Sequence, residues 1–181
     1  FIELGCSGFT KIYDPGKPQL PVLNKLIEVP YGADIQVNII SYNEQVIELA
    51  GKGIVQKIMP SQPSISKNIS LTDVPFYYDQ AFYQTNAFNS NDMVTVSMAG
   101  TIRGVKMAQM SLAPFRYNPV TNVLKVYNDI VFEIVFNHPD VVLTEQMKSK
   151  YYSPYFESSL NSMINHTQPA AKDALTKYPV K

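Results

Sequence analysis

The chain of 181 residues has little of what an active site is usually built from. It holds one cysteine, Cys6, two histidines, His138 and His166, and no tryptophan. A single cysteine cannot form an internal disulfide, and nothing near Cys6 in the sequence supplies the base that a nucleophilic thiol needs. Two isolated histidines without a paired spacing predict no zinc site. We therefore expect a non-catalytic chain with neither a metal nor a cofactor.

An excess of charge of one sign and long apolar runs are also missing. Lys and Arg together number 15, as do Asp and Glu, so the formal net charge is zero. No long-range field draws such a chain to nucleic acid or to an anionic membrane. No run of 18 apolar residues is present, which predicts no transmembrane helix. Residues 1–5 lack the regions of a signal peptide, and we expect a processed or trimmed N-terminus.

Short strand patterns fill the first 143 residues. Residues 34–42 largely alternate apolar and polar side chains, which is typical of a half-buried strand. Many short strands without intervening helical patterns predict an antiparallel sandwich. Asn128-Asp129 predicts a tight hairpin turn, because both residue types tolerate a left-handed backbone. The further strand predictions are 45–49, 53–59, 93–98, 104–112, 123–127 and 130–136.

The pattern changes to helix after residue 144. Ser153 can cap a helix, and Pro154 suits its first position. We predict a helix at 154–165, packed on the sheet through Phe156, Leu160 and Ile164. A second, short helix is predicted around 79–82, inside a segment with few strand signals.

These patterns together predict one mostly-β domain. We expect an antiparallel β-sandwich, or jelly-roll-like domain, over residues 1–166, with a C-terminal helix. Residues 167–181 are mostly polar and carry Pro169 and Pro179, which predicts a flexible, extended tail.

Three stretches carry a family resemblance. The first is Gly16-Lys-Pro-Gln-Leu-Pro-Val-Leu-Asn-Lys-Leu-Ile-Glu-Val-Pro30, and the second runs from Gly100-Thr-Ile-Arg-Gly-Val-Lys-Met107 on to 113–127. The third is Tyr152-Ser-Pro-Tyr-Phe156. Their order and spacing resemble the N-terminal prodomain of gingipain-type cysteine peptidases, over roughly residues 16–166. The lysine-specific branch is the most similar, notably in Lys25-Leu-Ile-Glu-Val-Pro30.

The resemblance implies an inhibitory and folding module. It implies a sandwich that docks on its own caspase-like catalytic domain and keeps that enzyme latent until secretion. It also implies a bacterial protein that passes through the periplasm and is secreted or held at the cell surface. The catalytic Cys–His pair of the family belongs to that other domain. The partner it implies is therefore the cognate peptidase catalytic domain.

Basic residues are the candidate inhibitory groups. A basic-specific protease holds a carboxylate in its primary pocket, and an arginine guanidinium pairs with it bidentately. Arg103, followed by Gly104, is the leading candidate, and Lys106 is the second. The alternative is that both are ordinary solvated charges. Lys181 is the candidate maturation site, unless it is merely where the chain was cut.

A second class of function stays open. The alternative is a free-standing sandwich that binds carbohydrate or protein on a bacterial surface. Such a module predicts an exposed aromatic row, and the Tyr- and Phe-rich segment 76–88 is the candidate for it. Aromatic residues at this density more often seal a core or an interface.

Overall fold

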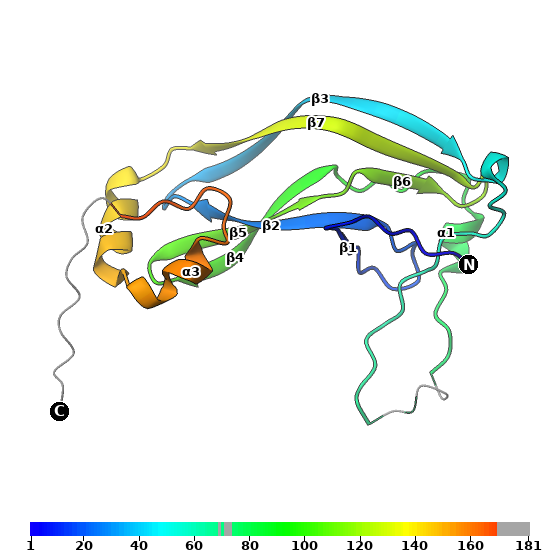
Figure 1. The fold of residues 1–181 in the computed structure, drawn as a ribbon, viewed down its shortest axis with the longest axis horizontal. Helices are drawn as coiled ribbons and strands as arrows, with labels where there is room; N and C mark the ends of the chain where they lie inside the picture. The colour runs from blue at the N-terminus through cyan, green and yellow to red at the C-terminus, as the bar shows by residue number, and fades with distance from the viewer. Residues whose placement is uncertain (69, 71–73, 170–181) are drawn as a thin grey trace. The chain divides into compact units, whose positions relative to one another are not determined.

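The computed structural model describes residues 1–68, 70 and 74–169, and two sheets dominate it (Figure 1). One sheet has the order β1-β2-β5-β4, and the other has the order β3-β7-β6. The mostly-β, antiparallel fold is as predicted. The strands are β1 (Thr10–Lys11), β2 (Pro21–Val29), β3 (Asp34–Glu48), β4 (Val94–Ile102), β5 (Val105–Leu112), β6 (Phe115–Asn118) and β7 (Val123–Asn137).

The helices are short. Helix η1 (Ala50–Lys52) follows β3, and α1 (Gln80–Gln84) begins at its cap Asp79, which accepts a hydrogen bond from the Phe82 amide. This helix confirms the one predicted around 79–82. The remaining helices come last in the described chain, as α2 (Val141–Tyr151), η3 (Pro154–Phe156) and α3 (Glu157–Leu160).

The chain divides into two compact units, each with its own core. Unit 1 comprises residues 1–23, 41–93 and 112–131, and unit 2 comprises 24–40, 94–111 and 132 onward. In unit 1 the Tyr83 hydroxyl is fully buried and donates to the Ile58 carbonyl at 2.6 Å, and burial raises the pKa of that hydroxyl. In unit 2 the buried residues Val105, Leu160 and Met163 form an apolar cluster.

The predicted hairpin at Asn128-Asp129 is wrong. Asp129 does adopt a left-handed backbone, with φ +49°, but β7 continues past it to Asn137 as one strand. Its carboxylate accepts a hydrogen bond from the Asn43 side chain of β3 at 2.8 Å. The left-handed residue therefore bends a paired strand instead of reversing it.

The predicted strand at 53–59 is also wrong. Only Ile58 makes a bridge, to Ile2, and several backbone groups bond to side chains instead. The Asn122 amide donates to the Ile54 carbonyl at 2.9 Å, and the Tyr117 hydroxyl accepts from the Ile58 amide at 3.4 Å. These polar side chains replace the partner strand that the apolar pattern predicted.

The helix predicted at 154–165 is shorter than expected. It begins at Pro154 as a 3₁₀ turn and ends at Leu160. Serine and asparagine dominate 158–162, and their side chains compete with the helical backbone for hydrogen bonds. Leu160 and Met163 enter the core, whereas the Ile164 side chain is 62% exposed and its amide donates to the Leu26 carbonyl of β2.

Candidate functional site

The tip of the β4–β5 hairpin presents the predicted inhibitory residues. Arg103 and Gly104 form its two-residue turn, with φ angles of +49° and +75°. Two consecutive positive φ angles are the signature of a type I′ turn, whose twist matches the flanking strands. The Arg103 side chain is exposed, and Gly104 is buried.

Two short helical segments support this turn (Figure 1). Gly104 packs so closely on α2 that an added Cβ would overlap the Met147 carbonyl group and lie 3.2 Å from the Tyr151 ring. The Arg103 guanidinium lies over the Phe156 ring of η3, 4.5 Å from its centroid. The turn is therefore held on its backbone side and on its side-chain side, which limits the conformations that Arg103 adopts.

The side chain of Lys106, the second candidate, packs on a different aromatic ring. Its ammonium lies 5.4 Å from the centroid of the Tyr31 ring, and the side chain is half-buried. Arg103 is therefore the more exposed of the two basic groups.

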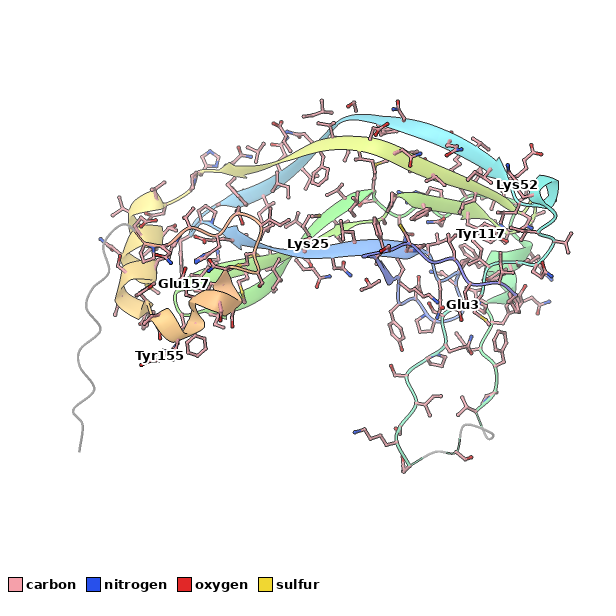
Figure 2. All side chains as sticks on the ribbon, in the orientation of Figure 1. Glu3, Lys25, Lys52, Tyr117, Tyr155 and Glu157 are labelled. Carbon is pink, nitrogen blue, oxygen red and sulfur yellow. The ribbon has the colours of Figure 1, made fainter. Side chains whose placement is uncertain are left out.

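Apolar side chains are exposed on the same helical segments. Tyr155 of η3 is 90% exposed and is labelled in Figure 2. Val141, Val142 and Tyr151 of α2 are exposed as well. Exposed aromatic and aliphatic side chains on the elements that support a basic side chain are typical of a protein-docking site.

A buried ionic cluster lies beneath these supports, and sequence reasoning missed it. It consists of Glu28 on β2, Lys148 on α2, Glu157 on α3 and His166. Lys148 Nζ lies 2.6 Å from Glu28 Oε1, and His166 Nδ1 lies 2.7 Å from Glu28 Oε2. No side chain of the cluster is more than 12% exposed. Buried charges are costly unless paired, so this cluster holds its segments in one arrangement.

Glu157 is the least satisfied member of the cluster. His166 Nε2 lies 3.4 Å from Glu157 Oε1, within ion-pair distance. Within the described ranges, neither Glu157 oxygen nor His166 Nε2 has a hydrogen-bond partner. This contact is an ion pair only when the imidazole carries a proton on both nitrogens.

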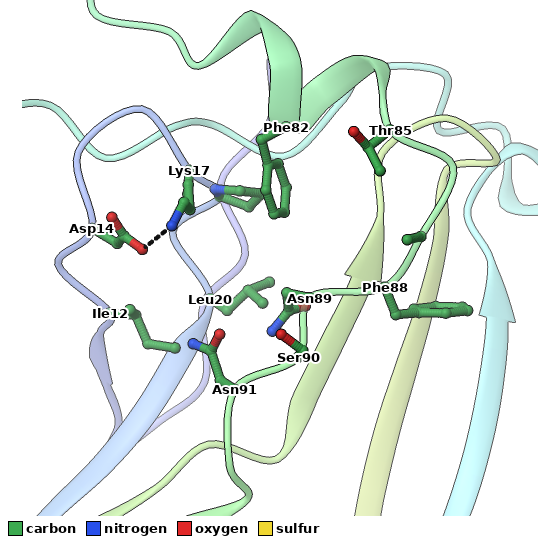
Figure 3. A pocket seen from close by; sticks show the side chains of 12 residues that line it. Ile12, Asp14, Lys17, Leu20, Phe82, Thr85, Phe88, Asn89, Ser90 and Asn91 are labelled. Atoms are coloured by element: carbon green, nitrogen blue, oxygen red, sulfur yellow. Dashed lines mark hydrogen bonds and ion pairs between the residues drawn. The ribbon is translucent and has the colours of Figure 1, made fainter.

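Unit 1 carries a pocket of about 260 Å³ (Figure 3). Lys17 and Asp14 stand at its wall and pair with each other at 2.9 Å, and this hydrogen bond raises the pKa of Lys17. Phe82, Phe88 and Asn89 line other parts of it. The ion pair neutralises its own charge, so the pocket offers a ligand no free ionic group from these two residues.

The aromatic segment 76–88 has mainly a packing role in unit 1. Tyr83 is fully buried, and its ring lies 4.6 Å from that of Tyr78. Phe76 and Tyr77 are about half exposed. The segment does not form the continuous exposed row that a surface-binding module predicts.

The other residues considered from the sequence do not assemble into a reactive centre. Cys6 is free and exposed in unit 1, and His138 is an exposed residue that faces Asp34 at 3.6 Å in unit 2. The described part of the chain contains no group of three metal-ligating side chains. Across the same residues, no helix is long and apolar enough to cross a membrane. Lys181 lies outside the described residues.

Comparison with known proteins places this geometry in context. The Propeptide_C25 family model matches residues 3–153. Lys-gingipain of Porphyromonas gingivalis is 36% identical over all 181 residues, and the chain spans only 10% of that relative's length.

Two solved structures are similar in fold. One, described as structural insight into zymogenic latency of gingipain K from Porphyromonas gingivalis, has a TM-score of 0.67 at 40% identity. The match covers 72% of this chain and 71% of that one. The other, a complex of Porphyromonas gingivalis RgpB pro- and mature domains, has a TM-score of 0.58 at 26% identity. It covers 73% of this chain and 64% of that chain.

Proposed function

This chain belongs to the Propeptide_C25 family, and we propose that it holds a gingipain-type cysteine endopeptidase latent by placing Arg103 in the active-site cleft. The chain is a non-catalytic prodomain of the gingipain type. The observation that carries the proposal is the exposed Arg103 at a type I′ turn supported by Met147 and Phe156. A side chain held this way loses little conformational entropy on docking.

The guanidinium suits the chemistry of such a cleft. An enzyme that cleaves after basic residues needs a carboxylate at the base of its primary pocket, and a planar guanidinium donates two parallel hydrogen bonds to it. A lysine ammonium acts only as a point charge. Tyr155 and the exposed residues of α2 supply the apolar contact area around the plug.

The turn also accounts for how a plug of this kind resists cleavage. Peptides that enter a protease cleft bind in an extended, strand-like form. Arg103 and Gly104 both have left-handed φ angles, so the peptide bond between them is not presented in that form. The backbone of Gly104 is held against α2, which opposes its rearrangement.

An inhibition assay tests the proposal. The chain is added to the catalytic domain of the same precursor, and we expect cleavage of a lysine- or arginine-containing reporter peptide to fall with a stoichiometric or saturable dependence. A free-standing carbohydrate- or protein-binding module, the other candidate, leaves the cleavage rate unchanged at every concentration.

The same family relationship supports a proposal about how the precursor folds, is exported and is processed. We expect the chain to assist folding of the catalytic domain and to leave it after export through the periplasm. The chain spans about a tenth of the Lys-gingipain relatives it matches, so the activity and specificity of the remaining part belong to this proposal.

Maturation is expected to cut after Lys181, which closes the sequence Tyr178-Pro179-Val180. Pro179 disfavours helix at the residue before it and favours an extended chain, the form that a protease cleft accepts. Lys181→Ala in the full precursor should therefore delay release of the catalytic domain. The measurement is a time course of processing with N-terminal sequencing of the mature enzyme. A mature N-terminus at any residue other than the one after Lys181 removes this site as the final cut.

A further inference from the structure

We propose that the buried ionic cluster is a proton-dependent clamp on the Arg103–Gly104 turn, with Glu157 and His166 as its positioning residues. This inference rests on the proposed function, because it concerns regulation of the same site. Each support of the turn is next in the chain to a member of the cluster. Met147 precedes Lys148 in α2, and Phe156 precedes Glu157.

His166 faces a carboxylate on each side. Its Nδ1 lies 2.7 Å from Glu28 Oε2, where an N–H donates to the carboxylate. With that proton on Nδ1, a neutral imidazole turns the lone pair of Nε2 toward Glu157 Oε1, 3.4 Å away. A second proton, shared between Nε2 and Glu157, replaces this repulsion by attraction. Among the described residues it gives the buried Glu157 its one ion-pair partner.

The remaining charge of the cluster does not supply that proton. Lys148 approaches from α2, but its Nζ binds Glu28 Oε1 at 2.6 Å and the Thr167 hydroxyl at 3.1 Å. Lys148 therefore neutralises the charge of Glu28, and His166 is the basic residue that pairs with Glu157. Histidine is the side chain that ordinarily changes charge between about pH 5 and 8, so this pair is the proton-sensitive part of the cluster.

The segment that carries His166 is joined to β2 along its length. The Ile164 amide donates to the Leu26 carbonyl at 3.0 Å. Asn165 exchanges two hydrogen bonds with the Glu28 backbone, at 2.7 and 2.9 Å. His166 is thus fixed to β2, and loss of the shared proton acts on Glu157 and on the adjoining Phe156, which supports Arg103.

The direction of the pH effect follows from the proton count. In the clamped form His166 and Glu157 share the second proton and are paired, and in the released form that proton and the pairing are lost. The clamped form therefore binds one proton more, so its stability relative to the released form falls as the pH rises. We expect the turn to be held firmly at acidic pH and inhibition to weaken through the neutral range.

The variant Glu157→Gln tests this. The carboxamide has nearly the same shape and donates an N–H to neutral Nε2, so the clamp no longer needs the proton. Inhibition constants are measured from about pH 6 to 8.5 for both chains against the same catalytic domain, which cancels the enzyme's own pH dependence. We expect the ratio of the unsubstituted chain's constant to the variant's to rise by up to tenfold per pH unit. A ratio that stays constant overturns the clamp.

Two further variants keep the test decisive. Glu133→Gln makes the same charge change at an exposed position of β7 in unit 2, and its inhibition should follow the unsubstituted chain at every pH. His166→Gln cannot become a cation and should inhibit with no dependence on pH beyond that of the enzyme. Pronounced clamp-like pH dependence in His166→Gln would falsify the assignment.

Hydrogen exchange on the free chain separates this inference from the proposed function. At high pH the Phe156 and Asn161 amides, which donate to the Ser153 and Glu157 carbonyls, should lose protection in Glu133→Gln and keep it in Glu157→Gln. If the chain inhibits at no pH, the proposed function fails, and the comparison of hydrogen exchange in the two variants still shows whether the clamp exists. If exchange is equal in the two variants across the pH range, the clamp fails whether or not the chain inhibits.

Discussion

Replacing Arg103 with alanine is expected to raise the inhibition constant of the chain by roughly 30-fold or more, which corresponds to about 2 kcal/mol. A desolvated charged group at the centre of an interface is typically where binding energy concentrates, because its removal leaves the partner's carboxylate buried and unpaired. The measurement is inhibition of the catalytic domain with the unsubstituted chain and the variant side by side.

Lys25→Ala is the matched control for Arg103→Ala. Lys25 lies on β2 in unit 2, is exposed and is labelled in Figure 2, so its loss removes one positive charge without touching the turn. We expect less than a threefold change from it, the size of an exposed charge effect. Lys106→Ala distinguishes the two candidate plugs. If Lys106→Ala weakens inhibition and Arg103→Ala does not, Arg103 is not the inhibitory residue, and the family assignment is unaffected.

Gly104→Ala is expected to lower the free energy of unfolding by about 3 kcal/mol or more, the sum of a backbone cost and an overpacking cost. A left-handed backbone costs an alanine about 1 kcal/mol, and the added methyl group meets the Met147 carbonyl, with its carbon only 2.7 Å away. Backbone atoms of a packed helix cannot give way as a flexible side chain does. Urea unfolding measures the loss, and inhibition should weaken at the same time because the turn leaves α2.

Gly53→Ala separates the two causes. Gly53 has φ +77°, close to the +75° of Gly104, but nothing lies within 4 Å of an added Cβ there. This variant therefore carries the left-handed cost alone, about 1 kcal/mol. An equal loss of stability in Gly53→Ala and Gly104→Ala contradicts the packing of the turn on α2.

Local signals in the sequence were enough to predict the two strands that flank the candidate site. The predicted runs 93–98 and 104–112 correspond to β4 and β5, but β4 extends to Ile102, so the connection is the two-residue turn Arg103-Gly104 and not a longer loop. Asn128-Asp129 shows the limit of the same reasoning. Asp129 does adopt the left-handed backbone that its residue type tolerates, but pairing with β3 decides whether such a residue turns a strand or bends it.

Helix α2 and the ionic cluster could not be predicted from local patterns. α2 begins with Val141 and Val142, which are β-branched and exposed, so no apolar stripe marks it. Asp140, whose carboxylate accepts from the Leu143 amide, was the one available signal of its start. Glu28 and Lys148 are 120 positions apart in the chain. The local sequence around a charged residue does not indicate whether the fold buries that residue in an ion pair.

The stacking of Arg103 on Phe156 makes the NMR chemical shifts of the Arg103 side-chain protons report on the state of the turn. Protons near the guanidinium lie over the face of an aromatic ring, 4.5 Å from its centroid, where the ring current shields them. Their resonances are therefore displaced upfield in the free chain. A partner that draws Arg103 into its own pocket removes this shielding, and the resonances return toward their ordinary positions. The free and docked states of the turn are thus distinguishable by proton chemical shift, without a label and without enzymatic turnover.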